Sequence, residues 1–403
     1  MGASVEAAPV SDRSSMTLHA NPLFAGLPTT IFEQMSGLAR QHQAINLGQG
    51  FPESEGPEDV RAAAARATLE GPNQYPPMLG TPALRQAVAE HYGRTQGLRL
   101  EPDQVVVTAG ATEALAAAFL ALITPGDEVV LFQPLYDAYA PMVRRAGGVP
   151  RFVTLEAPEW RLTEAALDAA FTPKTRLVVF NSPHNPAAVV YPREQLELLA
   201  GYCRRFDCIA VCDEVWEHVV FDGREHLPLM ALPGMAERTV KIGSAGKIFS
   251  LTGWKVGWLI SAPEIAAVLA RAHQFLTFTV APNLQAGAAF GLNRPDAPLE
   301  AMRRDFARSR DRLAAGLKAA GFAPLESAGT YFLNVDLRAS GVALDDRSFC
   351  LRAVAKAGVA AIPVSAFYEA DAPSHLIRLC FAKSDATLDA ALERLETARK
   401  RLV

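Results

Sequence analysis

The sequence QVVVTAGATEALAAAFLALI, from Gln104 to Ile123, places three consecutive valines directly before a segment rich in alanine and leucine. Valine favours strands, whereas alanine and leucine favour helices, so the stretch predicts a strand that turns sharply into a helix. The strand is apolar at successive positions, which is typical of a strand buried on both faces of a parallel sheet.

The same order of strand and helix recurs along the following part of the chain. We predict further apolar strands at residues 128–132, 175–180, 208–212 and 239–244, and helices at residues 57–70, 81–97, 136–147 and 193–206. Strands that alternate with helices predict the α/β class, with a mostly parallel sheet covered by helices. We assign this large domain to residues 57–295.

The residues after NRPDAP, at positions 293–298, have a different pattern. A long helix rich in arginine precedes short apolar strands and a final helix, which predicts a smaller α+β domain over residues 296–403. We expect residues 21–56 to form an N-terminal arm and part of that domain, and residues 1–20 to form a disordered tail. A cleft between two such domains is a common place for a ligand.

Composition excludes several classes of partner. The 403 residues carry a net charge of −4, without the basic excess of a nucleic-acid-binding protein. No apolar run has the length of a membrane span, and the first residues lack the apolar core of a signal peptide. We therefore expect a cytoplasmic protein that acts on small molecules. The five cysteines lack the paired spacing of a metal site, so we predict buried free thiols and no metal.

Three predicted strands end in polar or small residues, at the sheet edge where α/β proteins bind ligands. The turn TAGAT allows backbone N–H groups around Gly110 to bind a phosphate, although an ordinary tight turn has the same sequence. Asn185, in the proline-fixed loop NSPHNP, offers a neutral amide or serves the loop itself. Asp213 ends a buried strand, so its carboxylate needs a cationic partner, a ring nitrogen or an arginine, unless it caps a helix.

Lys247 lies between small residues and an aromatic, glycine-containing run in SAGKIFSLTGWKVGW, residues 244–258. A surface lysine is one interpretation, and a desolvated amine that forms a Schiff base with an aldehyde is the other. Under the second interpretation, Lys247, Asp213 and the turn at Gly110 together supply the groups that one cofactor needs. Pyridoxal phosphate needs a lysine for its aldehyde, an acid for its ring nitrogen and donors for its phosphate, so we predict this cofactor.

The chain resembles the class I, fold type I, pyridoxal-phosphate aminotransferases, and among them the kynurenine aminotransferase and glutamine transaminase K group. The motifs that carry the resemblance span residues 45–383 in the family's order: INLGQGFP, NQYPPMLGTPALR, VTAGATEAL, PGDEVVLFQPLYDAY, NSPHNP, CDEVWEHVVFDG, GSAGKIFSLTGWKVGW, GTYFLNVD, AIPVSAFY and IRLCFAK. The resemblance implies a fold type I domain with a smaller domain beside it.

The resemblance also implies a role for individual residues. Lys247 would be the catalytic lysine that binds the cofactor and moves protons. The implied cofactor-binding residues are Ala111, Thr112, Tyr136, Asn185, Asp213, Trp216, Ser244, Lys247 and Lys255, with Tyr75 contributed by a second subunit of a homodimer. Arg378 would hold the substrate carboxylate as a bidentate fork, together with Asn185 and the backbone of Gly50, and Phe32 would lie beside the substrate.

Two positions depart from the family pattern. Trp216 stands where tyrosine is usual, so the hydroxyl that contacts the cofactor's phenolic oxygen is replaced by an indole, which either donates in its place or packs in the core. Ala187 and Ala188 stand where threonine and glycine are usual. We interpret the nearby His184, His218 and Glu214 as structural residues.

The function implied is an aminotransferase that moves an amino group between an L-amino acid and a 2-oxo acid. The expected donors are neutral or aromatic, such as methionine, glutamine, phenylalanine or kynurenine. NQYPPMLGTPALR is also similar to N-succinyl-diaminopimelate aminotransferases, which keeps that substrate as an alternative. The change at Trp216 leaves a β-lyase or another reaction of the same cofactor as a further alternative, and a cofactor-binding sensor without turnover as a third.

Overall fold

A computed structural model describes residues 19–402 of the chain. All but the last two residues of the tail predicted at positions 1–20 lie outside this range. The strands are β1 (Ile45–Asn46), β2 (Val105–Thr108), β3 (Glu128–Gln133), β4 (Val149–Thr154), β5 (Thr175–Asn181), β6 (Ile209–Asp213), β7 (Thr239–Ser244), β8 (Gly257–Ile260), β9 (Ala323–Pro324), β10 (Phe332–Asp336), β11 (Val359–Ala360), β12 (Ile362–Pro363) and β13 (Leu376–Cys380).

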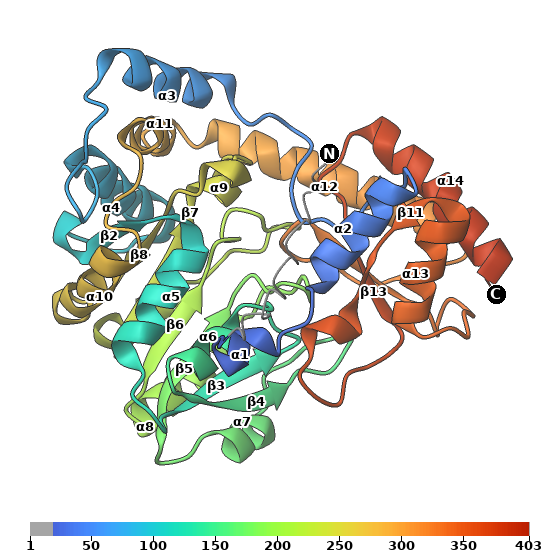
Figure 1. Cartoon of the computed structure of the whole chain (residues 1–403), viewed down its shortest axis with the longest axis horizontal. Coiled ribbons are helices and arrows are strands. Elements are labelled where there is room, and N and C mark those ends of the chain that lie inside the picture. Colours follow the sequence, from blue (N-terminus) through green and yellow to red (C-terminus); the bar gives the residue numbers. More distant parts are fainter. Residues whose placement is uncertain (1–18, 403) are drawn as a thin grey trace, which may run out of the picture.

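The helices surround these strands (Figure 1). They are α1 (Pro22–Ala25), α2 (Ile31–Gln41), α3 (Glu58–Glu70), α4 (Pro82–Gln96), α5 (Gly110–Leu122), α6 (Tyr139–Arg145), α7 (Glu164–Ala170), α8 (Arg193–Arg205), α9 (Ala245–Ile248), α10 (Pro263–Leu276), α11 (Pro282–Leu292), α12 (Ala297–Ala319), α13 (Asp346–Ala357) and α14 (Asp385–Leu402).

Seven strands form the large sheet in the order β2-β8-β7-β6-β5-β3-β4. Neighbouring strands from β4 to β7 are parallel, and only β8 runs antiparallel to its neighbours within this sheet. The predicted α/β class and mostly parallel sheet are therefore confirmed. Within residues 57–295, the sequence prediction missed β4, β8 and the helices α7, α9, α10 and α11.

Both faces of this sheet are buried, which explains why consecutive residues in the middle of β5 and β6 are apolar. On β5, Leu177 and Val179 belong to the same hydrophobic cluster as residues of α5. The alternate residues Val178 and Phe180 belong to a second cluster that includes residues of α8. Successive side chains of a strand point to opposite faces, so α5 and α8 cover opposite faces of the sheet.

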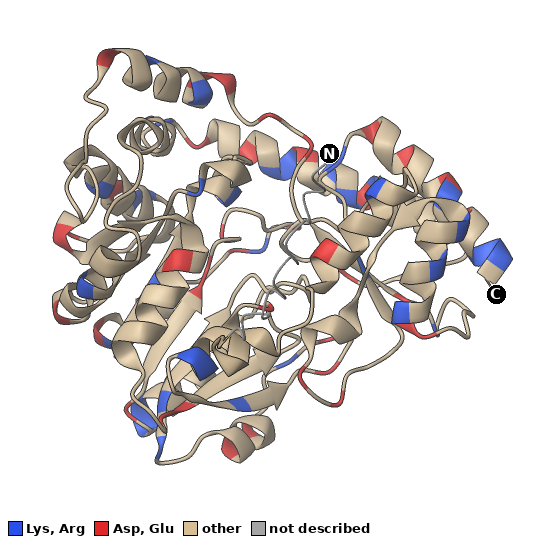
Figure 2. Ribbon diagram, in the orientation of Figure 1, with Lys and Arg blue, Asp and Glu red and all other residues tan. Residues whose placement is uncertain are grey.

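A four-stranded sheet, in the order β12-β13-β10-β9, lies in the C-terminal third of the chain. The N-terminal segment joins it, because β1 pairs in parallel with β11 and α2 contacts α13. Helix α12 runs from the large sheet towards these elements, and Figure 2 shows both signs of charge on α12 and α14. Arg312 of α12 pairs with Asp389 of α14 at 2.6 Å, which ties the two helices together.

The cysteines are all buried and free, as the sequence predicts. Cys203 lies on α8, Cys212 on β6 and Cys380 on β13. No helix in the described part of the chain is both long and apolar enough to cross a membrane.

Candidate functional site

A cavity of about 320 Å³ lies at the C-terminal ends of the central strands. Ten of the residues singled out from the sequence line it: Gly50, Ala111, Thr112, Tyr136, Asn185, Asp213, Trp216, Ser244, Lys247 and Lys255. They come from separate segments, which the parallel strands bring to one sheet edge. Phe51, Leu115, Tyr139 and Asn181 also line the cavity and were not predicted.

Lys247 lies on the short helix α9, directly after β7. Burial lowers the pKa of its amine to about 8, so a larger fraction is neutral at physiological pH than for an exposed lysine. Its Nζ donates to the hydroxyl of Tyr331 at 3.1 Å and lies 4.6 Å from the centre of the Trp216 ring. The interpretation of Lys247 as a desolvated amine therefore agrees with the structure.

Asp213 is the last residue of β6 and is buried. Its Oδ2 accepts a hydrogen bond from Tyr139 at 2.6 Å, whereas its Oδ1 is buried without a partner among the described residues. Burial raises the pKa of the Asp213 carboxyl, because the charged form is poorly solvated. A cationic N–H donor beside Oδ1 would relieve this cost.

The neighbouring loop is held by Asn181 at the end of β5. Its side-chain nitrogen donates to the backbone oxygen of Asp213 at 2.7 Å, and its side-chain oxygen accepts from the backbone N–H of Asn185 at 2.7 Å. Ala188, further along the loop, has a φ of 61°, a conformation that favours glycine. The loop thus keeps a left-handed residue at a position where the family usually has glycine.

Arg378 on β13 is fully buried and is joined to the cavity through Asn185. Its Nη1 donates to Asn185 at 2.8 Å and its Nη2 to the backbone oxygen of Gly48 at 3.1 Å. The guanidinium carbon lies 3.8 Å from the ring centre of Phe332, 4.9 Å from that of Phe367 and 5.3 Å from that of Phe32. Burial lowers its pKa to about 10, so Arg378 stays cationic at neutral pH.

Tyr75 does not line the cavity of its own chain. Its side chain is 83% exposed and contacts Phe278 edge to face, with ring centres 5.6 Å apart. It therefore faces solvent in the single chain, whereas the other predicted cofactor-binding residues line the cavity.

Next to Asp213, a buried ionic cluster surrounds Lys241. The Lys241 ammonium donates to Glu214 and, at 2.6 Å, to Glu217, and His226 lies 3.0 Å from Glu214. Glu214, Glu217 and His226 are close enough to hold a metal ion, but the Lys241 ammonium already pairs with both carboxylates. His218 bonds to His91 at 2.8 Å, so Glu214 and His218 both take part in structural networks.

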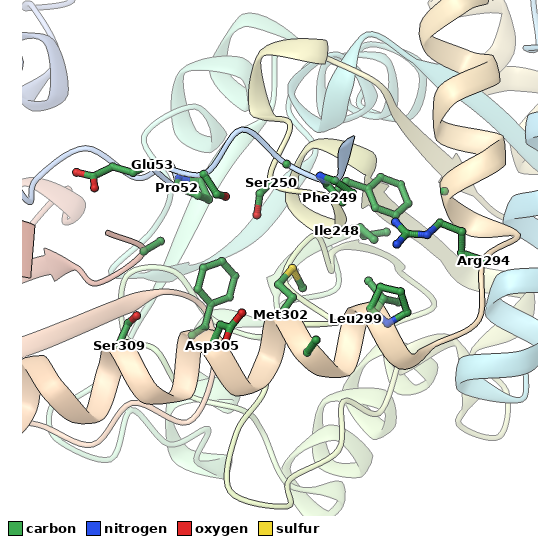
Figure 3. Close-up of a pocket in the computed structure, with 18 of the residues that line it drawn as sticks. Pro52, Glu53, Ile248, Phe249, Ser250, Arg294, Leu299, Met302, Asp305 and Ser309 are labelled. Carbon is green, nitrogen blue, oxygen red and sulfur yellow. The ribbon is translucent and has the colours of Figure 1, made fainter. Parts of the chain in front are cut away.

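Figure 3 shows a second and larger cavity, of about 850 Å³, between α12 and the residues that follow Lys247. Leu299 and Met302 of α12 line it together with Ile248 and Phe249. Three arginines at this cavity are each paired with an aspartate: Arg94 with Asp296, Arg294 with Asp59 and Arg308 with Asp305. We therefore place the candidate active site in the smaller cavity, which has Lys247 and Asp213.

Comparison with known proteins agrees with this geometry. Residues 42–395 match the family described as aminotransferase class I and II. The chain belongs to this family. It is 44% identical to the probable N-succinyldiaminopimelate aminotransferase of Mycobacterium tuberculosis, with 93% of this chain and 97% of that protein covered. It is 42% identical to the methionine aminotransferase of Escherichia coli, with 92% and 96% covered.

Kynurenine–oxoglutarate transaminase 1 of Homo sapiens is 36% identical, with 89% of this chain and 93% of that protein covered. Among solved structures, N-succinyldiaminopimelate aminotransferase from M. tuberculosis aligns with a TM-score of 0.91 and 43% identity, over 94% of this chain and 100% of that one. The chain is thus a fold type I aminotransferase, and its cofactor is pyridoxal phosphate.

The cavity fits this cofactor. The unpartnered Oδ1 of Asp213 suits the protonated ring nitrogen, and the Lys247 amine, whose pKa is lowered by burial, suits the aldehyde. The first residue of β8, Gly257, packs directly against the start of α5. A Cβ atom added at Gly257 would lie only 2.8 Å from the backbone of Gly110. A Cβ at Gly110 would in turn lie 3.4 Å from the Lys255 Nζ. A cation beside a helix N-terminus suits the phosphate.

Proposed function

We propose that this aminotransferase takes the amino group from a neutral or aromatic L-amino acid and passes it to a 2-oxo acid, with Lys247 as the catalytic residue. The observation that carries the proposal is the presence, in one cavity, of a lysine with a lowered pKa and a buried carboxylate with an unpartnered oxygen. The cofactor supplies an aldehyde that accepts the amino group and a protonated ring that withdraws electrons.

The chain's own residues hold and orient this group. Asp213 would accept the ring N–H through Oδ1, while Tyr139 holds the carboxylate through Oδ2. Asn185 would donate to the phenolic oxygen, and Tyr136 would pack on the ring. The backbone of Ala111 and Thr112, with Ser244 and Lys255, would hold the phosphate. Lys247 would hold the aldehyde and, once freed by substrate, move the proton at the substrate α-carbon.

Arg378 binds the substrate carboxylate in this proposal. Its Nε is buried without a partner among the described residues, and three aromatic rings surround its guanidinium. Low solvent access strengthens a charge-assisted pair between guanidinium and carboxylate. Asn185 and the backbone around Gly50 complete the contact.

The substrate side chain meets apolar surroundings. Phe51, Leu115 and Trp216 line the cavity, and Phe32 lies beside Arg378. Among the described residues, the cations that line the cavity are Lys247 and Lys255, and both have proposed roles. A second carboxylate on the donor would find no partner from this chain, which favours neutral donors over aspartate or glutamate.

A half-reaction assay tests this proposal. Methionine, glutamine, phenylalanine and kynurenine are each mixed with the cofactor-loaded enzyme, without a 2-oxo acid, and the conversion of the cofactor to its amine form is followed by absorbance. We expect at least one of them to react roughly a hundredfold faster than aspartate or glutamate, because a buried unpaired carboxylate costs several kcal/mol. Equal rates for neutral and acidic donors would contradict the proposed selectivity.

N-Succinyl-diaminopimelate is the second candidate donor, because a relative with that printed activity is 44% identical over most of both chains. It belongs in the same panel with its 2-oxo acid product. Release of pyruvate and ammonia from a cysteine conjugate, without any 2-oxo acid, would instead identify a β-lyase. If no donor converts the cofactor, the sensor interpretation replaces transamination.

We also propose a cytoplasmic homodimer with shared active sites. Tyr75 is useful in the site only if a second subunit supplies it, and its exposed side chain is available for that contact. Phe278, which contacts Tyr75, is exposed, as are three further apolar side chains close in sequence to one or the other: Leu69, Phe275 and Leu276. Such a surface is typical of a large obligate interface.

A further inference from the structure

Tyr331, directly before β10, connects two segments that are far apart in the sequence. Its hydroxyl donates to the backbone oxygen of Gly50 at 2.5 Å and accepts from the Lys247 Nζ at 3.1 Å. The side chain is almost completely buried. One hydroxyl therefore joins the lysine on α9 to the N-terminal segment that lines the cavity.

Aromatic neighbours hold the Tyr331 ring in place. Trp216 packs against it edge to face, with ring centres 4.3 Å apart and an interplanar angle of 89°. Phe332 and Phe306 lie at 5.0 and 5.9 Å. The Lys247 Nζ is 4.6 Å from the Trp216 ring centre, and no side-chain hydrogen bond of the Trp216 indole occurs within the described residues. Trp216 thus acts on Tyr331 and Lys247 by packing.

The direction of the two hydrogen bonds follows from the chemistry of the groups. A tyrosine hydroxyl has one proton, and the Gly50 carbonyl can only accept, so Tyr331 gives its proton to Gly50. Burial raises the Tyr331 pKa well above its usual range, so the hydroxyl stays protonated at neutral pH. A lone pair of the same oxygen accepts the hydrogen bond from the Lys247 Nζ, and this contact stabilises the ammonium form of Lys247.

We propose that Tyr331 is the positioning residue of Lys247: its hydroxyl fixes the lysine amine relative to Gly50, and Trp216 fixes the Tyr331 ring. The inference rests on the proposed role of Lys247. Tyr331 acts through Lys247, and its hydroxyl contacts the amine and the Gly50 backbone.

The first test uses the cofactor-free protein and does not depend on turnover. Reductive methylation of Lys247 with formaldehyde and cyanoborohydride is followed by peptide mass spectrometry between pH 6 and pH 10. In Tyr331→Phe we expect the midpoint of Lys247 reactivity to fall by about one pH unit, because the ammonium loses an accepting oxygen. Tyr191→Phe is the matched control, because the Tyr191 hydroxyl is buried without a partner among the described residues.

The second test uses the loaded enzyme and its best donor. We expect Tyr331→Phe to lower kcat roughly tenfold while KM changes little, because a misplaced amine slows proton movement more than binding. Tyr191→Phe should match the wild type. The proposal would be overturned if Tyr331→Phe lowered kcat but left the pH midpoint of Lys247 reactivity equal to that of Tyr191→Phe. It would also be overturned if the two variants had the same kcat and the same midpoint.

Trp216 provides a second pair of variants in case Tyr331→Phe folds poorly. Trp216→Phe keeps an aromatic edge beside Tyr331 and should retain the wild-type midpoint, whereas Trp216→Ala should shift it as Tyr331→Phe does. Equal midpoints in Trp216→Ala and Trp216→Phe would overturn the proposal. A wild-type protein that neither binds the cofactor nor transaminates would disprove the proposed function. The shift of the Lys247 midpoint in Tyr331→Phe would still test the contact between Tyr331 and Lys247, because that measurement needs no cofactor.

Discussion

Lys247 and Lys255 are eight positions apart and line the same cavity, but we expect different effects from replacing them. Borohydride reduction of the loaded enzyme should fix the cofactor on Lys247, and Lys247→Ala should remove that label and nearly all turnover. Lys255→Ala should keep the label and weaken cofactor binding by about 1.5–3 kcal/mol, the strength of a charge-assisted hydrogen bond. Peptide mapping locates the label, and cofactor titration measures the change in binding. A label on Lys255 would contradict the assignment.

The lowered pKa of Lys247 predicts how cofactor capture depends on pH. Only the neutral amine attacks an aldehyde, and burial lowers the Lys247 pKa from 10.5 to about 8. Capture by the cofactor-free protein should therefore become faster as pH rises and level off above about pH 8. Stopped-flow absorbance measures this rate. A rate that keeps rising towards pH 10.5 would mean that the amine is solvated.

At the scale of elements, the ends of β6 and β7 depend on the buried cluster around Lys241. Lys241→Met would leave Glu214 and Glu217 buried without their cation, so we expect a loss of about 3–5 kcal/mol in the free energy of unfolding. Urea denaturation measures this loss. Replacing all three residues together, as Lys241→Met with Glu214→Gln and Glu217→Gln, should recover most of it, because no charge is then left unpaired.

The exposed pair of Lys400 and Glu396 on α14 is a matched control for this prediction. Lys400→Met should change the free energy of unfolding by less than about 0.5 kcal/mol, because an exposed helical pair is solvated in both states. A similar loss in the two lysine variants would show that water reaches the Lys241 cluster.

At the scale of the whole molecule, the apolar surface around Tyr75 predicts how the subunits associate. Phe275 is 85% exposed at the end of α10, so Phe275→Glu would place a charge in the proposed interface. We expect this variant to sediment as a monomer and to lose activity, because Tyr75 no longer reaches the second site. Val149→Glu, on the edge strand β4, should stay dimeric. A monomeric and active wild type would contradict shared sites.

The division into a large domain at residues 57–295 and a smaller one at residues 296–403 stays a prediction. Helix α12 begins at Ala297 and extends towards the smaller sheet, so the proposed boundary falls at its first residues. Limited proteolysis that cuts near residue 296 would support the division.

The pattern of residue types was enough to predict the strands that are buried on both faces and the residues at their ends. β2, β5 and β6 each contain at least three consecutive apolar residues, and Asn185, Asp213 and Lys247 lie at or just after the ends of parallel strands, close enough to meet at one edge. β4 was missed because it is half exposed and contains Pro150, which weakens its strand signal. β8 was missed because it is only four residues long, begins with Gly257 and closely follows the 3₁₀ segment Thr252–Trp254.

Which distant groups meet in the site depends on how the elements pack together, and no local pattern predicts it. Tyr139 reaches Asp213 across 74 positions, and Tyr331 reaches Lys247 across 84 and Gly50 across 281. Local patterns of hydrophobicity report the period of one element and carry no record of the elements that pack against it. The lowered pKa of Lys247 likewise depends on burial by several segments, which only the packed chain creates.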